Sequence, residues 1–310
     1  MPSHRSHISK FLEHEHHQGR LLREALRQNR GQFYRGARRE LRRVSKKQAR
    51  ALYAHNPYAR ALLFEHLSKM VHAAVGARLP SWLPDRPVYF ITIIDRRQIV
   101  PPFGKIMATG YAKEPTITAI GASYRKHLLG IDYVGMIDFA YYISARNSLP
   151  DNYIGVPHIH AIAWNIDENT LESYARAARA KIRPIFTYAT AFHFRKIDPK
   201  TFARVLWYVC KSPRSQFQLH KKSNGRTKQY SSDIVPRNRL RFLNIMHSHS
   251  LLNYVQAGGE GIEVVRHAVA KIRDLPIEYP EIRAKRDPFS DPWPNDEDPM
   301  LGRNRWGPWD

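Results

Sequence analysis

The chain has 310 residues, of which 43% are hydrophobic, so it is long enough to bury a sizeable core and is not a disordered polypeptide. Its formal net charge is +23 and its sequence pI is near 10.2, values that argue against an enzyme of small metabolites. The simplest partner for so basic a surface is a polyphosphate backbone, which makes nucleic acid the leading candidate.

The amino terminus carries no signal-peptide pattern, and the sequence contains no long uncharged apolar run. We therefore expect a soluble, cytoplasmic protein with no membrane partner. Cys210 is the single cysteine, which excludes an internal disulfide and a multi-cysteine zinc module and fits a reducing compartment.

Residues 1–80 combine many arginines with apolar residues at helical spacing, and we predict a basic helical region. Its densest stretch contains the candidate DNA-contacting residues Arg38, Arg39, Arg42 and Arg43. Such a row of cations can follow a phosphate backbone, and a solvated helical face is the equally open alternative. The cluster His14-Glu15-His16-His17 lacks the four-residue histidine spacing of a zinc-protease helix, so we interpret it as surface.

A different pattern follows a Pro-rich hinge and defines a second region, residues 81–215. We expect strands at 88–95, 133–143, around the histidines at 158 and 160, and at 187–195, with helices at 117–129 and near 171–182. The order is strand, helix, strand, strand, helix, strand. It predicts an α+β domain with a ferredoxin-like or RRM-like antiparallel sheet and helices on one face.

Two further regions complete the chain. Residues 216–275 begin as a polar, basic stretch and continue with helical spacing, so we predict a mobile loop over 221–241 and then a helix over 239–272 that is broken by glycines. Residues 276–310 concentrate Pro, Asp and Trp without periodicity, and we expect a flexible tail.

Two histidines lie inside the strand-like run from Val156 to Asn165. Alternate side chains of a strand share a face, so His158 and His160 should point together while Ile159 points to the opposite, apolar side. Neutral imidazole is a common ligand of divalent metals, and we interpret the pair as two ligands of one ion. The alternative is a pair of hydrogen-bonded surface histidines.

A helix is expected to begin at Asp198 and Pro199 and to end at Pro213. Its apolar residues follow the spacing of a core-facing stripe: Phe202, Val205, Leu206 and Val209. Arg204, Tyr208 and Lys211 are spaced by four and three residues, so we expect them together on the opposite, accessible face. The alternatives are a half-buried aromatic residue and an ordinary cation at a helix C-terminus.

Three motifs together resemble the HUH endonuclease superfamily, in particular its rolling-circle replication initiators with one catalytic tyrosine. They are the strand Phe90-Ile91-Thr92-Ile93-Ile94-Asp95, the segment Pro157-His158-Ile159-His160, and the helical segment Tyr208-Val209-Cys210-Lys211. The resemblance covers roughly residues 88–211. It implies an endonuclease that nicks single-stranded origin DNA through a 5′-phosphotyrosine bond and leaves a 3′-hydroxyl that primes replication.

The resemblance also assigns roles. It implies Tyr208 as the nucleophile and Lys211 as its supporting cation. Arg204, on the same helix face, is a further candidate DNA contact. The resemblance further implies a third metal ligand on the strand before the histidine strand, a place that Asp138 fits, with Asp151 in the connecting loop as a competing ligand. Two histidines and one carboxylate suit Mg²⁺ or Mn²⁺.

The expected partners are single-stranded origin DNA, a host helicase and a host polymerase, with no small-molecule cofactor. No phosphate-binding Gly-Lys-Ser loop is present, so we expect no fused helicase. A relaxase or a single-strand transposase of the same superfamily is a related alternative. From a different class, the alternative is a non-catalytic RNA- or DNA-binding protein with a ferredoxin-like sheet, in which the histidines are structural.

Overall fold

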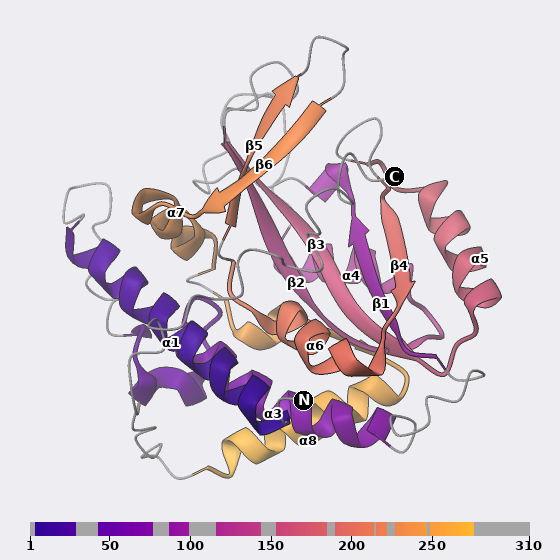
Figure 1. The fold of residues 1–310 in the computed structure, drawn as a ribbon, viewed down its shortest axis with the longest axis horizontal. Helices are drawn as coiled ribbons and strands as arrows, with labels where there is room; N and C mark the ends of the chain where they lie inside the picture. Colours follow the sequence, from indigo (N-terminus) through magenta and orange to yellow (C-terminus); the bar gives the residue numbers. More distant parts are fainter. Residues whose placement is uncertain are drawn as a thin grey trace.

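A computed structural model of the chain describes residues 4–28, 43–76, 87–98, 116–143, 153–184, 190–213, 215–221, 227–246 and 249–275. Over these ranges the protein is α+β, with a curled mixed sheet and flanking helices (Figure 1). Arg38, Arg39, Arg42, Asp151 and the predicted tail over 276–310 lie outside the described residues. Within the described ranges, no helix is both long and apolar enough to cross a membrane.

The described strands form one sheet in the order β4-β1-β3-β2-β5-β6, with β7 paired to β2. Their bounds are β1 Tyr89–Ile94, β2 Asp132–Ile143, β3 Tyr153–Trp164, β4 Phe192–Lys196, β5 Ser215–Lys221, β6 Thr227–Asp233 and β7 Val255–Gly258. β1 is antiparallel to β3 and β4, and β2 is antiparallel to β3. These four predicted strands thus pair antiparallel, as expected, and β5, which the prediction did not include, joins β2 in parallel and makes the whole sheet mixed.

Helices lie both in front of the sheet and behind it. The α-helices are α1 His4–Gln28, α3 Pro57–Gly76, α4 Ile117–Arg125, α5 Glu168–Arg179, α6 Phe202–Cys210, α7 Pro236–Met246 and α8 Glu260–Arg273. The short 3₁₀ helices are η2 Lys46–Ala51, η3 Arg96–Gln98, η4 Pro199–Thr201 and η5 Leu251–Asn253. Figure 1 shows α6 in front of the central strands and α4 behind them, which corrects the expectation of helices on one face.

The polar stretch after α6 is not the predicted loop but an antiparallel hairpin, β5–β6, followed by α7. The hairpin projects beyond the central strands (Figure 1), and residues such as Tyr230 on β6 are exposed. A ribbon in contact with solvent needs no apolar alternation, so its sequence carries little strand signal. Backbone pairing with β2 through β5 holds it in place.

The predicted helix over 239–272 is interrupted by a strand. β7 pairs antiparallel with β2, and α8 starts two residues later. Gly259 between them has φ +52°, and a Cβ there would collide with the Asp132 side chain, so the turn requires glycine. The glycines mark this strand-to-helix turn and not a simple break in one helix.

The described residues of the amino-terminal region are mostly helical, and they do not stand apart from the rest of the chain. Phe11 of α1 and Leu62 of α3 belong to the same hydrophobic core as Ile159 of β3. α3 packs along both α1 and α8. His14 and Glu15 are buried, which corrects their interpretation as surface residues. The first helices are therefore part of the fold that supports the sheet.

Candidate functional site

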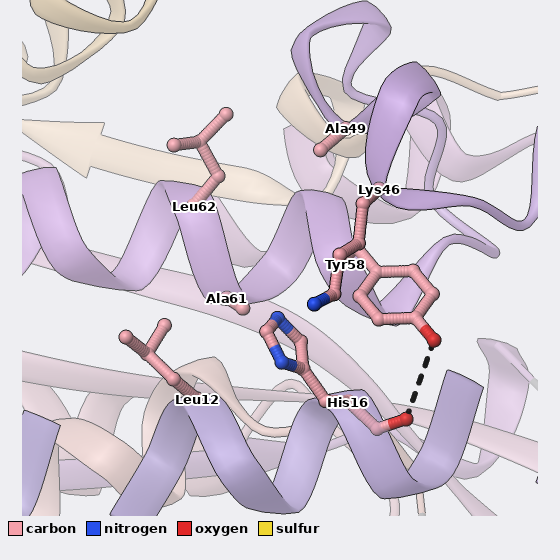
Figure 2. A pocket seen from close by; sticks show the side chains of 7 residues that line it. All are labelled: Leu12, His16, Lys46, Ala49, Tyr58, Ala61 and Leu62. Carbon is pink, nitrogen blue, oxygen red and sulfur yellow. Dashed lines mark hydrogen bonds between the residues drawn. The ribbon is translucent and has the colours of Figure 1, made fainter. Parts of the chain in front are cut away.

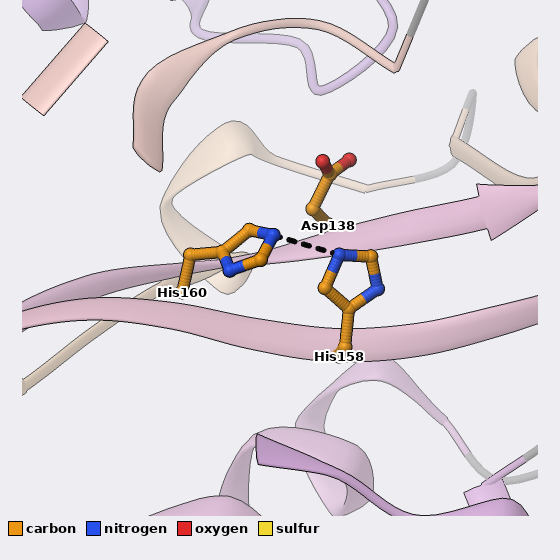
Figure 3. Close-up of side chains that lie close together, drawn as sticks. All are labelled: Asp138, His158 and His160. Atoms are coloured by element: carbon orange, nitrogen blue, oxygen red, sulfur yellow. Dashed lines mark hydrogen bonds between the residues drawn. The ribbon is translucent and has the colours of Figure 1, made fainter. Parts of the chain in front are cut away.

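Asp138, His158 and His160 converge on one face of the two longest central strands (Figure 3). Register explains why: Asp138 on β2 lies directly opposite His158 on β3, and His160 is two residues further along the same face. All three side chains are buried. Strand alternation together with the β2–β3 register is sufficient to assemble the group.

The geometry of this group could hold a metal ion. One candidate ligand atom from each residue lies within 4.8 Å of those of the other two. The Nε2 atoms of His158 and His160 face each other at 2.9 Å (Figure 3). Two imidazole nitrogens and one carboxylate oxygen form a mixed donor set that leaves coordination positions open for water or a substrate oxygen.

Neighbouring oxygens fix both imidazole rings through their Nδ1 atoms. Nδ1 of His158 is 3.2 Å from the carbonyl of Val156, which can only accept, so this nitrogen carries the proton and Nε2 presents a lone pair. Nδ1 of His160 is 3.0 Å from the hydroxyl of Thr92, which can accept or donate. Hydrogen bonds of this kind orient the histidines of metal sites.

Burial and neighbouring charges keep the three groups in their ligating forms. Burial lowers the pKa of His158, and burial followed by the nearby His158 lowers the pKa of His160 well below its usual value. Burial alone would raise the pKa of Asp138, but the positive charge of Lys211 and smaller contributions outweigh it, and the net pKa is lowered. At neutral pH the group is two neutral imidazoles and a carboxylate.

Tyr208 lies next to the histidines. Its ring centroid is 4.8 Å from that of His160 and 5.9 Å from that of Phe90, both edge-to-face. The side chain is half-buried and packs against the core, so the prediction of a fully accessible tyrosine is wrong. The helix phase was correct, because Phe202 and Val209 are buried, but the face opposite this stripe meets the sheet rather than solvent.

Lys211 links the tyrosine to the carboxylate. Its Nζ lies 3.2 Å from Oδ2 of Asp138 and 4.0 Å from the centroid of the Tyr208 ring. Because α6 ends at Cys210 and not at Pro213, Lys211 is the C-cap residue and already has an extended backbone with ψ 152°. The end of the helix thus directs this side chain towards the sheet.

Two site residues escaped prediction. Thr92 and Phe90 sit two residues apart on β1, and Phe90 stacks on His160 at 5.3 Å between centroids. The guanidinium of Arg195 on β4 lies over the Phe90 ring at 5.6 Å. Phe90 and Thr92 share a face because side chains alternate along β1. Their contact with His160 depends on the β1–β3 register, which no local sequence pattern specifies.

Of the predicted DNA-contacting arginines, Arg204 and Arg43 lie within the described residues. Arg204 is half-buried on α6, and Arg43 places its guanidinium 5.1 Å from the ring of Tyr53 in the amino-terminal region. A small hollow in that region is enclosed by α1, η2 and α3 (Figure 2). His16 lines it, and burial, followed by the charge of Lys46, lowers the pKa of this histidine to about 4.

Comparisons with known proteins leave the site to be interpreted from its own geometry. No family model, no curated protein and no solved structure matches this chain.

Proposed function

We propose that the protein is a metal-dependent DNA strand-nicking and joining enzyme that initiates rolling-circle replication. One observation carries the proposal: a tyrosine and a lysine from α6 meet two histidines and an aspartate from the sheet. The strand order β4-β1-β3-β2, with α4 and α5 as its connections, supports a ferredoxin-like core of the expected kind. The charge of +23 supports a polyanionic substrate.

In the proposed reaction, the hydroxyl oxygen of Tyr208 attacks a backbone phosphorus of single-stranded DNA. A bond forms between this oxygen and phosphorus, and the bond from phosphorus to the 3′-oxygen breaks. The proton lost by the tyrosine is balanced by the proton gained by the 3′-oxygen, which leaves as a hydroxyl. The reverse reaction, with a 3′-hydroxyl as the attacking group, rejoins strands and releases Tyr208.

Lys211 suits a supporting role in this step. Its ammonium group lies over the tyrosine ring, where a positive charge favours the phenolate or stabilises charge on the departing oxygen. Asp138, His158 and His160 fit a hard divalent cation such as Mg²⁺ or Mn²⁺. When bound, such a cation supplies a Lewis acid that polarises the scissile phosphate. A host helicase and polymerase would act on the nicked product.

The test is incubation of the purified protein with labelled single-stranded DNA from its own replicon, in Mn²⁺ or in chelator, followed by a denaturing gel. We expect a metal-dependent covalent adduct that Tyr208→Phe abolishes while DNA binding is kept. Tyr174→Phe, at a half-buried tyrosine of α5, is the matched control and should form the adduct. Tight, salt-sensitive binding without an adduct would overturn the proposal in favour of a non-catalytic nucleic-acid-binding protein.

The identity of the productive DNA separates the related functions. A nick at a replication origin supports an initiator. A nick at a transfer origin supports a relaxase, and cleavage only at the ends of a mobile element supports a single-strand transposase. All three use the same covalent step, so they differ in the substrate and not in the roles of Tyr208 and Lys211.

A further inference from the structure

The peptide unit between Lys211 and Ser212 is held on both sides by buried charged side chains. The Ser212 N–H donates to Oε1 of Glu15 at 3.0 Å, and Nη1 of Arg60 donates to the Lys211 carbonyl at 3.2 Å. Glu15 is 0% exposed on α1 and Arg60 is 2% exposed on α3. The N–H of this peptide unit is thus bound by a carboxylate, and its C=O is bound by a guanidinium group.

Further contacts fix both charged groups. The Ser212 hydroxyl donates to the second oxygen of Glu15, and Nδ1 of His14 lies 3.2 Å from Oε1. Burial alone would raise the pKa of Glu15, but hydrogen bonds and the charge of its neighbours outweigh it and lower the pKa, which favours the carboxylate. Nη2 of Arg60 also reaches the sulfur of Met246 on α7, at 3.8 Å.

This arrangement controls where Lys211 points. A peptide unit bound at both its N–H and its C=O cannot rotate without losing two charge-assisted hydrogen bonds in the interior, where each such loss is expensive. Lys211 is the first residue beyond α6, so the helix ladder does not set its ψ angle of 152°. The two bound groups set it instead, and the side chain then extends to Asp138 and Tyr208.

We propose that Glu15 and Arg60 are positioning residues for Lys211, so that the two amino-terminal helices form part of the catalytic unit. The effect of this positioning on catalysis rests on the proposed function, whereas the orientation of Lys211 itself does not. Buried charges are a costly means of stabilising a fold, since apolar residues of similar size often do as well. Their use at this one peptide unit fits a requirement for an exact backbone orientation.

Two readouts test the inference. The first is the single-turnover rate of adduct formation for Glu15→Ala, Glu15→Gln and Arg60→Met, each alone and combined with Lys211→Met. Loss of correct positioning predicts a rate lower by about ten- to a hundredfold. Glu15→Gln keeps an acceptor for the Ser212 N–H and should recover part of the rate. Because the residues act through Lys211, adding either change to Lys211→Met should lower the rate little further.

The second readout needs no activity. Labelling of Lys211 by an amine-reactive ester, followed by mass spectrometry, should be severalfold faster in Glu15→Ala than in the unaltered protein, because its side chain is only 12% exposed. Tyr58→Phe is the matched control: Tyr58 is buried on α3, and the hydroxyl that the change removes bonds to Arg23 and to the His16 carbonyl. It should change neither readout.

The outcomes separate the two proposals. If the unaltered protein forms no adduct but labelling of Lys211 rises in Glu15→Ala, the proposed function fails and the positioning role stands. If Glu15→Ala and Arg60→Met match Tyr58→Phe in labelling, the positioning role is overturned, whatever the protein does to DNA. Ser212→Ala, which removes only the hydroxyl contact, provides a milder variant should Glu15→Ala not fold, and it should raise labelling by a smaller factor.

Discussion

The candidate site has two halves that are built in different ways. The sheet half, Asp138, His158 and His160, could hold a metal ion; it lies on neighbouring strands in the centre of the sheet and is fixed by strand register. The helix half, Tyr208 and Lys211, lies at the C-terminal end of the short helix α6. Side chains of α1 and α3 bind the backbone that follows this end. The geometry of the three candidate metal ligands therefore depends on the pairing of β2 with β3, whereas the position of Tyr208 and Lys211 depends on helices that are distant in sequence.

A buried ion pair links the two halves, in addition to the ring contact of Tyr208 with His160, and its loss should have the largest effect. Lys211→Met leaves the Asp138 carboxylate without its partner at 3.2 Å, where the side chains are 12% and 8% exposed. We expect the free energy of unfolding in chelator to fall by about 3 kcal/mol, as for other broken buried pairs. Mn²⁺ should restore part of it, because the ion supplies the missing positive charge.

Denaturant unfolding with and without Mn²⁺ measures this effect. Lys69→Met is the matched control, because its pair with Glu65 at 3.0 Å is on the surface and should contribute under about 1 kcal/mol. Equal losses in the two variants would show that Lys211 and Asp138 do not couple the halves.

Replacement of a metal-ligating histidine should weaken metal binding by the sheet half and leave the helix half in place. We expect His158→Ala to weaken Mn²⁺ binding by at least about a hundredfold, since changes even to groups that only orient ligands reach that size. Titration calorimetry measures it, with His66→Ala, a half-buried histidine of α3, as the control. Labelling of Lys211 should change little, and unchanged Mn²⁺ affinity would contradict the ligand assignment.

A smaller effect is expected from the group that orients His160. Thr92→Val preserves the shape of a buried side chain but removes the hydroxyl that lies 3.0 Å from Nδ1 of His160. Mn²⁺ affinity should fall by about tenfold, less than for a ligand replacement. Thr118→Val, on the exposed face of α4, should leave the affinity unchanged. An effect as large as that of His158→Ala would mean that the substitution disturbs β1 itself.

The amino-terminal helices that support Lys211 should show a smaller sensitivity to acid. The pKa of His16 falls from 6.5 to about 4 on folding, first through burial and then through the charge of Lys46. Between these pH values the unfolded chain binds a proton that the folded chain does not, so stability falls as pH decreases from about 6.5 to about 4. His16→Gln removes this proton uptake.

We expect the loss of unfolding free energy between pH 7 and pH 5 to be smaller in His16→Gln than in the unaltered protein by on the order of 1 kcal/mol, after allowance for partial exposure. Denaturant unfolding at the two pH values measures it. His267→Gln, at an exposed histidine of α8, serves as the control. Identical pH dependence in all three proteins would show that the environment of His16 does not disfavour its charge.

The two halves differ in how far their sequence could predict them. Alternation along one strand placed His158 and His160 on a shared face, and the structure brings them together with Asp138, which the resemblance implied on the preceding strand. Thr92 could not be found in this way, because its partner is specified by the pairing of β1 with β3. Period-two patterns give the face of a strand but not its neighbour.

For the helix half, periodicity identified the shared face of Tyr208 and Lys211 but not what that face meets. The interpretation of Glu15 as a surface residue failed for a related reason. A carboxylate inside a helix with histidines on both sides has the composition of a solvated face, and its burial follows only from the docking of α1 on the chain after α6. Polar residues that serve a distant backbone leave no local signal.

α3 and α8 pack together although they lie far apart in the sequence. At roughly 5–20 residues per second, α3 leaves the ribosome on the order of ten seconds before α8 is complete. During that interval the face of α3 that packs on α8 lacks its final partner, whereas Phe11 of α1, which stacks on Phe64, has already been synthesised. The growing chain therefore exposes part of this helix to solvent until α8 has emerged.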